Sequence, residues 1–390
     1  MIDLDLIDWE WIESHRNCDP KQLSLKYGKE KRFEIIQIEC RQRAEKKLPE
    51  TLKNQRFLFP SILSSMQATS DYVADIHARI IGNCRSVLDM TCGLAIDSFR
   101  IAANADNVTS IDINSDYIDI AKWNASCLGL DNIDFINADS VEWLTHTPVH
   151  FDAIYIDPAR RDSNNRRCFD LKECYPDVTT LVSLFKSRTR KVIIKASPML
   201  DVDALISQLT DISSIYAVGT VKECKELLIV LEFDSTSQIS LHSVTSAGKQ
   251  TYISDFPFKY DSFAIYSSPE VGGYIYLPYP AIMKIGHLDY IAANTGVHKI
   301  SRDTHVFYSS KSVAQFPGLG FRILKIMPFD KHTIKEFSSY YPEINVTAKN
   351  FPLTSSALAK RLKIKEGGSL RLFALTLNDH SRKLIVCDNL

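Results

Sequence analysis

The spacing of apolar and polar positions changes twice along the chain. Up to about residue 84, apolar residues recur at intervals of three and four among many charges, which is typical of amphipathic helices. The stretch ATSDYVADIHARIIG closes this region and offers Ser70 as a helix N-cap and Gly82 as a stop. We therefore expect an N-terminal helical region over residues 1–84.

Between residues 85 and 235, short β-rich runs alternate with helical segments. The runs are SVLDMT, NVTSIDI, NIDFINA, FDAIYID, KVIIKAS, SIYAVGTV and ELLIVLEF. Strands that alternate with helices form βαβ units and a mostly parallel sheet. Only KECK separates the last two runs, which is too short for a parallel crossover, so this pair should be antiparallel. The pattern predicts an α/β domain with a doubly wound, seven-stranded, mostly parallel sheet.

Residues 236–390 show a third pattern, that of a small α+β module. SQISLHSVTSAGKQTYISDF predicts a hairpin, and PAIMKIGHLDYIAANTG predicts one helix closed by Gly296. After FPGLG come strand FRILKIM, helix KHTIKEFSSYY, strand INVTAKNF, helix SSALAKRLKI and strands LRLFALTL and KLIVC.

Composition is that of a soluble globular protein. Of the 390 residues, 45% are hydrophobic and 24% charged, and the net charge is −1. No stretch of about 18 uncharged apolar residues predicts a membrane span, and the start MIDLDLIDWEWIESHRN lacks the features of a signal peptide. The nine cysteines are scattered without a CxxC pair. A disulfide framework or zinc knuckle is therefore not expected, and a reducing cytoplasm fits best.

Acidic residues end the predicted parallel strands, where a doubly wound sheet binds its ligand. Asp89 closes the first strand, and Gly93 after it allows close approach to the backbone. The motif is not GxGxxG, which weakens a nucleotide-dehydrogenase interpretation. Asp112 ends the second strand and suits two ribose hydroxyls, Asp139 follows the third and could accept from an adenine amino group, and Asp157 ends the fourth.

The order of an Asp-x-x-x-Gly loop, an acid after the second strand, NAD after the third and DPAR after the fourth resembles class I S-adenosylmethionine-dependent methyltransferases. The resemblance implies a Rossmann-like methyltransferase domain and S-adenosyl-L-methionine as cofactor. The whole chain resembles bacterial RNA methyltransferases that carry a ferredoxin-like segment and a THUMP-like domain, THUMP domains being tRNA-binding modules. We therefore expect a methyltransferase domain at 85–235, a ferredoxin-like segment at 236–318 and a THUMP-like domain at 319–390.

The resemblance also implies which residues bind the cofactor. The methionine part would be lined by Asp89, Thr91, Cys92 and Gly93. The ribose would be held by Asp112 with Ile113, and the adenine by Asp139 with Ser140. Two other polar residues are expected to be structural. Asp97 would brace the following helix, and His77 has no partner in view.

The fourth strand end, FDAIYIDPARRD, is the expected catalytic element. Asp157 could accept a hydrogen from the attacking amine or hydroxyl, and Pro158 would stiffen the turn that presents it. Four arginines follow within eight residues, and they form either a clamp for the phosphates beside the target nucleotide or a solvated loop. We favour the clamp, which consists of Arg160, Arg161, Arg166 and Arg167.

Residue types at the strand ends narrow the choice of methylated atom. The first half of the domain is similar to guanine-N2 enzymes of the trimethylguanosine synthase type, although DPAR lacks their stacking aromatic. Methylation at carbon-5 needs a cysteine nucleophile, and neither DPAR nor KASP contains one. Cys168 and Cys174 follow in a loop, so carbon-5 is disfavoured without being ruled out.

A ribose 2′-O mechanism is the alternative. Asp157, Lys195 and Glu226 match three members of the Lys-Asp-Lys-Glu set of fibrillarin-like and heat-shock-type enzymes. The segment that would supply the first lysine has none. We therefore predict methylation of a base nitrogen, with Asp157 and Lys195 as catalytic residues.

Charge distribution indicates the partner. Residues 281–390 contain 16 Lys and Arg against 8 Asp and Glu, a surplus of +8. A basic module on an acidic enzyme suggests that it holds a polyanion, so tRNA or ribosomal RNA is the predicted partner, and no membrane or metal is expected. Two other functions stay open: a methyltransferase of small molecules or proteins, and a non-catalytic RNA-binding protein with this fold. The basic module argues against the first and the intact strand-end acids against the second.

Overall fold

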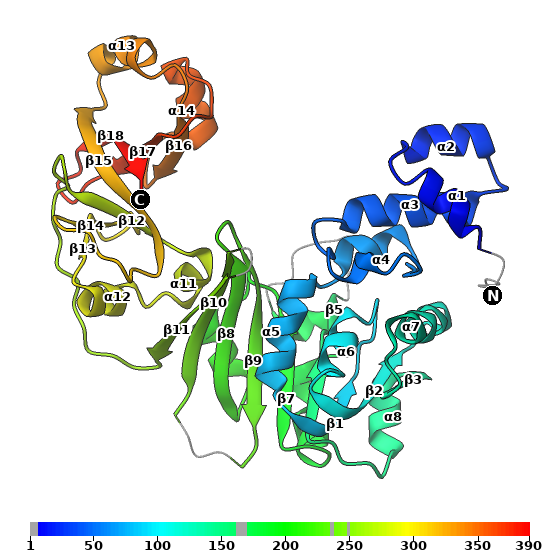
Figure 1. The fold of residues 1–390 in the computed structure, drawn as a ribbon. Coiled ribbons are helices and arrows are strands. Elements are labelled where there is room, and N and C mark those ends of the chain that lie inside the picture. Colours follow the sequence, from blue (N-terminus) through cyan, green and yellow to red (C-terminus); the bar gives the residue numbers. More distant parts are fainter. Residues whose placement is uncertain (1–6, 161–169, 235–237, 248–249) are drawn as a thin grey trace. The chain divides into compact units, whose positions relative to one another are not determined.

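The computed structural model describes residues 7–160, 170–234, 238–247 and 250–390. The chain forms two compact units (Figure 1). The first comprises Met1–Ile215 with Glu226–Ser237, and the second comprises Tyr216–Lys225 with Gln238–Leu390. Every helix within the described residues falls short of the length and apolar character that crossing a bilayer requires.

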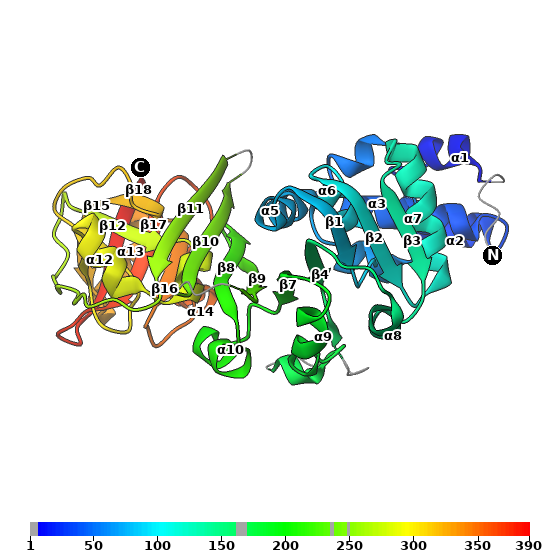
Figure 2. The same cartoon turned by 90° about the horizontal axis from the view of Figure 1, so that it is seen from below.

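A nine-stranded sheet has the order β11-β10-β8-β9-β7-β4-β1-β2-β3. Its strands are β1 (Cys84–Asp89), β2 (Ala105–Asp112), β3 (Ile133–Asn137), β4 (Ala153–Ile156), β7 (Lys191–Ala196), β8 (Ile212–Thr220), β9 (Cys224–Glu232), β10 (Ser240–Ala247) and β11 (Gln250–Pro257). Neighbouring strands from β3 to β7 are parallel, and β9 is antiparallel to β7. Figure 2 shows β1, β2 and β3 side by side. All seven predicted strands are confirmed, and the predicted hairpin supplies β10 and β11.

The central strands are apolar at consecutive positions because both faces of the sheet are covered. All four residues of β4 are buried, and so are Val192, Ile193 and Ile194 of β7. The connecting helices are α6 (Ile96–Ile101), α7 (Ser115–Leu128), α8 (Ser140–His146), α9 (Val182–Lys186), α10 (Val202–Gln208) and the 3₁₀ helices Leu171–Glu173 and Val178–Thr180. This is the doubly wound arrangement that the alternating pattern predicted.

The N-terminal helical region packs onto this domain. Its helices are α1 (Trp9–Ser14), α2 (Pro20–Tyr27), α3 (Arg32–Ala44), the 3₁₀ helix Thr51–Lys53, α4 (Ile62–Gln67) and α5 (Asp71–Ile81). Ala44 of α3 and Phe57 share one buried cluster with Ile118 of α7. As predicted, the Ser70 side chain caps the start of α5, and the helix stops at Gly82, whose φ is 81°. The helical region is therefore part of the core that supports the sheet.

The second unit contains a seven-stranded sheet in the order β13-β14-β12-β15-β18-β17-β16. Its strands are β12 (Tyr274–Pro278), β13 (His298–Lys299), β14 (Phe307–Ser309), β15 (Gly318–Pro328), β16 (Asn345–Lys349), β17 (Arg371–Thr376) and β18 (Arg382–Asn389). Its helices are α11 (Pro280–Ile285), α12 (Leu288–Thr295), α13 (Lys331–Tyr340) and α14 (Ser355–Leu362). The prediction of one helix up to Gly296 is wrong. Gly286 adopts a φ of 85°, a left-handed conformation that ends α11 and separates it from α12.

Candidate active site

A pocket of about 560 Å³ lies where β1, β2, β3 and β4 end. That volume suits a small-molecule site. Ser64 and Thr69, from the N-terminal helical region, also line it. The predicted residues that line the pocket are Thr91, Cys92, Gly93, Asp112, Ile113, Asp139, Ser140, Asp157 and Pro158. Parallel strands explain this convergence, because their carboxyl ends meet at one edge of the sheet.

Asp112 joins the end of β2 to the glycine loop after β1. Its Oδ2 accepts a hydrogen bond from Gly93 N and its Oδ1 one from Asn114 N, both at 2.9 Å. Gly93 has a φ of 52°, in the left-handed region that a residue without Cβ adopts at little cost. The carboxylate therefore fixes the loop while facing the pocket.

Asp89 is fully buried and does not line the pocket. Its carboxylate accepts hydrogen bonds from Thr91 N at 3.0 Å and from Ser98 Oγ. Thr91 Oγ1 in turn accepts one from Asp157 N at 2.8 Å. Burial raises the pKa of Asp89 to about 7. Asp89 thus holds the glycine loop from behind, and Thr91 ties that loop to the end of β4.

Asp139 caps α8 and receives a side chain that the sequence did not single out. Its Oδ1 accepts from two backbone N–H groups, one of them Glu142 N at 2.9 Å, and its Oδ2 accepts from the Tyr175 hydroxyl at 2.9 Å. The Glu142 N–H lowers the pKa of Asp139. Tyr175 reaches the pocket because β6 (Cys174–Tyr175) pairs antiparallel with β5 (Ala159–Arg160). No local pattern signals such a two-residue pairing.

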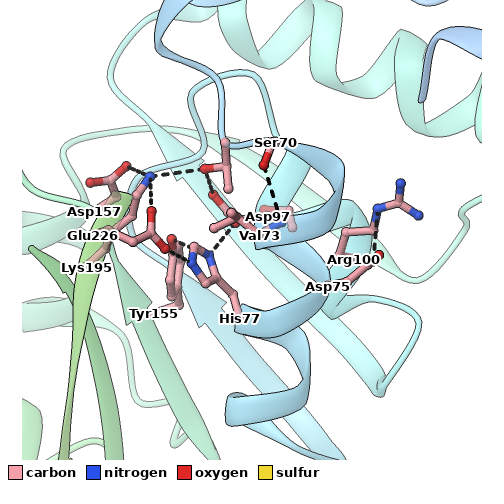
Figure 3. Close-up of polar contacts among 12 residues, drawn as sticks. Ser70, Val73, Asp75, His77, Asp97, Arg100, Tyr155, Asp157, Lys195 and Glu226 are labelled. Carbon is pink, nitrogen blue, oxygen red and sulfur yellow. Dashed lines mark hydrogen bonds and ion pairs between the residues drawn. The ribbon is translucent and has the colours of Figure 1, made fainter. Parts of the chain in front are cut away.

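Asp157, Lys195 and Glu226 lie together, as Figure 3 shows. Lys195 Nζ donates to Asp157 Oδ2 at 2.7 Å and lies 3.9 Å from Glu226 Oε2. The Lys195 side chain is 14% exposed, whereas that of Asp157 is 43% exposed. Asp157 Oδ1 has no hydrogen-bond partner in the part of the chain that the structure describes.

The pKa values of this pair follow from their surroundings. Burial alone would lower the pKa of Lys195, but Asp157 and Glu226 raise it above its usual range. Burial raises the pKa of Asp157, and the ammonium group opposes that shift. Lys195 therefore stays charged at neutral pH, and it favours the ionised form of Asp157.

His77, fully buried on α5, links this pair to Asp97 (Figure 3). Its Nδ1 lies 2.7 Å from Asp97 Oδ1, and its Nε2 makes a short hydrogen bond with Glu226 Oε1. Thr69 Oγ1 donates to Asp97 Oδ2 at 2.7 Å and accepts from Lys195 Nζ at 3.1 Å. These contacts close a ring of five side chains, the buried charge ring: Thr69, His77, Asp97, Lys195 and Glu226.

The charges in this ring stabilise one another. Burial alone would lower the pKa of His77, but Glu226 and Asp97 raise it to about 9. For the Asp97 carboxyl the directions are reversed. Burial alone would raise its pKa, but His77 lowers it to about 2. Asp97 was expected to brace the following helix, and the structure places it in the first turn of α6 against His77. The partners of His77 could not be found from the sequence, because Glu226 is 149 residues away.

Part of the predicted phosphate clamp lies outside the described residues. Arg161, Arg166 and Arg167 fall there, as does Cys168. The backbone of Arg160 pairs with Cys174, which is a buried cysteine. The clamp therefore stays a prediction. Where the structure is described, no group of three or more His, Cys, Asp or Glu side chains could hold a metal ion.

Three family models match consecutive parts of the chain. The matches are a methyltransferase domain at residues 83–247, a ferredoxin-like domain at 274–317 and a THUMP domain-like region at 318–389. A crystal structure described as a "putative methyltransferase" from Porphyromonas gingivalis W83 superposes with a TM-score of 0.85 and 25% identity. The superposition covers 98% of this chain and 97% of that one.

Three relatives have names that state an activity. An uncharacterized S-adenosylmethionine-dependent methyltransferase of Mycobacterium tuberculosis is 26% identical over 332 residues, 83% of this chain and 87% of that protein. An uncharacterized RNA methyltransferase of Mycoplasma mobile is 37% identical over 76 residues, which span only 20% of this chain and 21% of that protein. A 23S rRNA (uracil(747)-C(5))-methyltransferase of Pectobacterium carotovorum is 27% identical over 166 residues, 41% of this chain and 42% of that protein.

The domain matches, the full-length superposition and the pocket at the strand ends agree with the resemblance noted in the sequence. The chain is therefore an S-adenosylmethionine-dependent methyltransferase that carries a ferredoxin-like and a THUMP-like domain.

Proposed function

We propose that this enzyme methylates a nitrogen of an RNA base, in tRNA or ribosomal RNA, and that Asp157 orients that nitrogen. RNA as the substrate class is supported by the names of two relatives, by the THUMP-like match and by the +8 surplus after residue 280. The role of Asp157 rests on one observation. Asp157 lines the pocket, and within the described residues Lys195 binds its Oδ2 while its Oδ1 accepts no hydrogen bond.

The pocket residues fit the methyl donor. S-adenosylmethionine, when bound, supplies a methyl group from a positively charged sulfur. Asp112 accepts two backbone N–H groups, and a carboxylate has about four acceptor positions, so it can also accept from the two ribose hydroxyls. Gly93 lets the methionine part approach the backbone, and Asp97 and Asp157 place negative charge on the pocket wall.

Asp157 has the geometry of a hydrogen-bond acceptor for an attacking nitrogen. Its Oδ1 can accept an N–H of the base, which turns the nitrogen lone pair toward the methyl group. As the new N–C bond forms and the S–C bond breaks, the nitrogen must lose its proton, and the carboxylate can take it. Lys195 holds the carboxylate in place through Oδ2.

A ribose hydroxyl is the second candidate, because Lys195 contacts Asp157 and also approaches Glu226. A hydroxyl is a weaker nucleophile than a base nitrogen and needs a base to remove its proton. The carboxylates around Lys195 keep it in the ammonium form, so it cannot be that base. It is also not among the residues that line the pocket. Both facts argue against a direct role for Lys195 in a ribose mechanism, and on that ground we put the base nitrogen first.

Methylation at carbon-5 requires a thiolate in the pocket. Cys92 lines the pocket, but burial raises the pKa of its thiol well above the usual range, which is the opposite of activation. Cys174 is buried. Neither of these two cysteines is therefore suited to be the nucleophile that the carbon-5 activity named for the Pectobacterium relative requires.

Nucleoside mass spectrometry of total RNA tests this proposal. RNA from a deletion strain should lack one base-methylated nucleoside, and the gene for the intact protein, but not for Asp157→Asn, should restore it. Loss of a 2′-O-methylated nucleoside would support the ribose mechanism instead, and loss of a 5-methylpyrimidine would support carbon-5. An unchanged set of modified nucleosides would contradict RNA as the substrate.

A further inference from the structure

Lys195 lies between two carboxylates that compete for its ammonium group. The distance from Lys195 Nζ is 2.7 Å to Asp157 Oδ2 but 3.9 Å to Glu226 Oε2. Glu226 is buried, so its charge attracts the ammonium strongly. A positive partner of Glu226 other than Lys195 weakens this competition.

His77 satisfies Glu226 from the opposite side. Its Nε2 bonds to Glu226 Oε1, while Lys195 approaches the other oxygen, Oε2. Asp97 holds the far side of the ring through Nδ1, so the imidazole is fixed at both nitrogens. At neutral pH this imidazole is an imidazolium, because the two flanking carboxylates outweigh the effect of its burial.

We propose that His77 is a positioning residue for methyl transfer, which neutralises Glu226 and so leaves the Lys195 ammonium to Asp157. His77 touches neither the pocket nor Asp157, and acts on Asp157 through two intervening side chains. The inference rests on the role of Asp157 in the proposed function, but it applies equally to a nitrogen or an oxygen acceptor.

The other charged or titratable groups near His77 are accounted for. The Tyr155 hydroxyl on β4 lies 3.2 Å from His77 Nδ1, and it is neutral because burial raises its pKa well above the usual range. On α5 itself, Asp71 and Asp75 pair with Arg100 of α6 (Figure 3 shows the Asp75 pair). Among the described residues, the other charges against the imidazole are the ring carboxylates of Asp97 and Glu226, and the Lys195 ammonium approaches Glu226 at its other oxygen.

The test is a carbon-13 NMR titration of aspartate-labelled full-length protein without RNA, with the Asp157 carboxyl signal assigned from Asp157→Asn. In His77→Gln, Glu226 should draw Lys195 away, so the midpoint of Asp157 should rise by about one pH unit or more. In Glu226→Gln the carboxylate that competes for Lys195 is removed, so the pH midpoint of the Asp157 titration should fall. In the double variant, the effect of removing His77 should largely disappear.

Asp75→Asn is the matched control, since it removes a carboxylate from the same helix outside the ring and should leave the Asp157 midpoint unchanged. An unchanged midpoint in His77→Gln, or an equal rise with and without Glu226, would overturn the proposal. If His77→Gln does not fold, the absence of a downward shift in Glu226→Gln would do the same. The titration needs no RNA, so failure to methylate any RNA would refute the proposed function and leave this result intact.

Discussion

Asp89 and Asp157 show how surroundings give two strand-end carboxylates different tasks. Asp89 is the last residue of β1 and Asp157 follows β4, and these two parallel strands are neighbours. Asp89 is enclosed by Thr91 and Ser98, and its burial raises its pKa to about 7. Asp157 instead meets an ammonium group and the open pocket. One is thus suited to hold a loop and the other to accept a proton.

Asp157→Asn should impair turnover far more than cofactor affinity. The amide keeps the size and one acceptor oxygen but loses the charge that takes the proton and binds Lys195. We expect the methyl-transfer rate to fall about 100-fold or more, the usual effect of losing a positioned acid–base group. Calorimetry with S-adenosylhomocysteine should show binding close to that of the unaltered protein. Full turnover in this variant would remove the role assigned to Asp157.

Asp112→Ala should weaken cofactor binding by about 1–3 kcal/mol, because the ribose hydroxyls lose their partner and the Gly93 loop loses its anchor. Isothermal titration calorimetry with S-adenosylmethionine measures this directly. Asp116→Ala is the matched control, since Asp116 is exposed in the first turn of α7 and does not line the pocket. Equal affinity in the two variants would contradict the ribose assignment.

His77 should make the stability of the first unit depend on pH. Its folded pKa of about 9 lies above its reference value of 6.5, so its stabilising effect is complete below pH 6.5 and is lost as the pH rises through 9. Between pH 7 and pH 10, the free energy of unfolding of the intact protein should fall by about 2 kcal/mol relative to that of His77→Gln. Parallel denaturation curves at several pH values give this difference. A constant difference would show that His77 carries no such charge.

The strand-end acids could be predicted from the sequence because each closes or follows a short run with the pattern of a strand. The buried charge ring could not, because its members come from four separate segments and only packing brings them together. His77 and Glu226 are 149 residues apart, and no local spacing connects them. Long-range interactions between single polar residues leave no periodic signal.

At the scale of elements, the hydrophobic period predicted every strand of the nine-stranded sheet, but not where helices break. PAIMKIGHLDYIAANTG keeps a helical period through Gly286, where a φ of 85° interrupts it. A glycine within a helical pattern is compatible with either outcome, and tertiary packing decides between them. The pairing of β5 with β6 was invisible for the opposite reason, since two residues are too few to show any period.

Gly286→Ala should destabilise the second unit by about 1 kcal/mol. No atom lies within 4 Å of the position a Cβ would take, so the cost is only that of the left-handed backbone. Asn294→Ala, at an exposed position in α12, is the control and should be neutral or slightly stabilising. Thermal unfolding measures the melting temperatures of both variants, which can then be compared. Equal melting temperatures would show that the break does not depend on glycine.

At the scale of the whole molecule, net charge conceals an uneven distribution. The chain carries −1, yet residues 281–390 carry +8. Four basic side chains cluster around the end of α14, and all are exposed: Lys360, Arg361, Lys363 and Lys365. Within the described residues, none of these four has an ion-pair partner within 4 Å. Exposed cations without anionic partners are suited to bind phosphates.

Replacing these four residues of the full-length chain by Gln should weaken RNA binding and reduce its salt dependence. Each phosphate that the protein no longer neutralises should lower the slope of log K against log salt by about 0.7–0.9, so the combined change should be about two to three units if most of the four bind phosphates. Fluorescence anisotropy with tRNA or ribosomal RNA fragments at several salt concentrations measures the slope. The matched control changes Lys21, Lys26, Lys29 and Arg32 to Gln, which removes the same charge from exposed positions of the N-terminal helical region. If the slope changes more in the THUMP-like variant than in the control, the RNA-binding surface lies in the THUMP-like domain. A purely nonspecific attraction to net charge would change the slope equally in both variants.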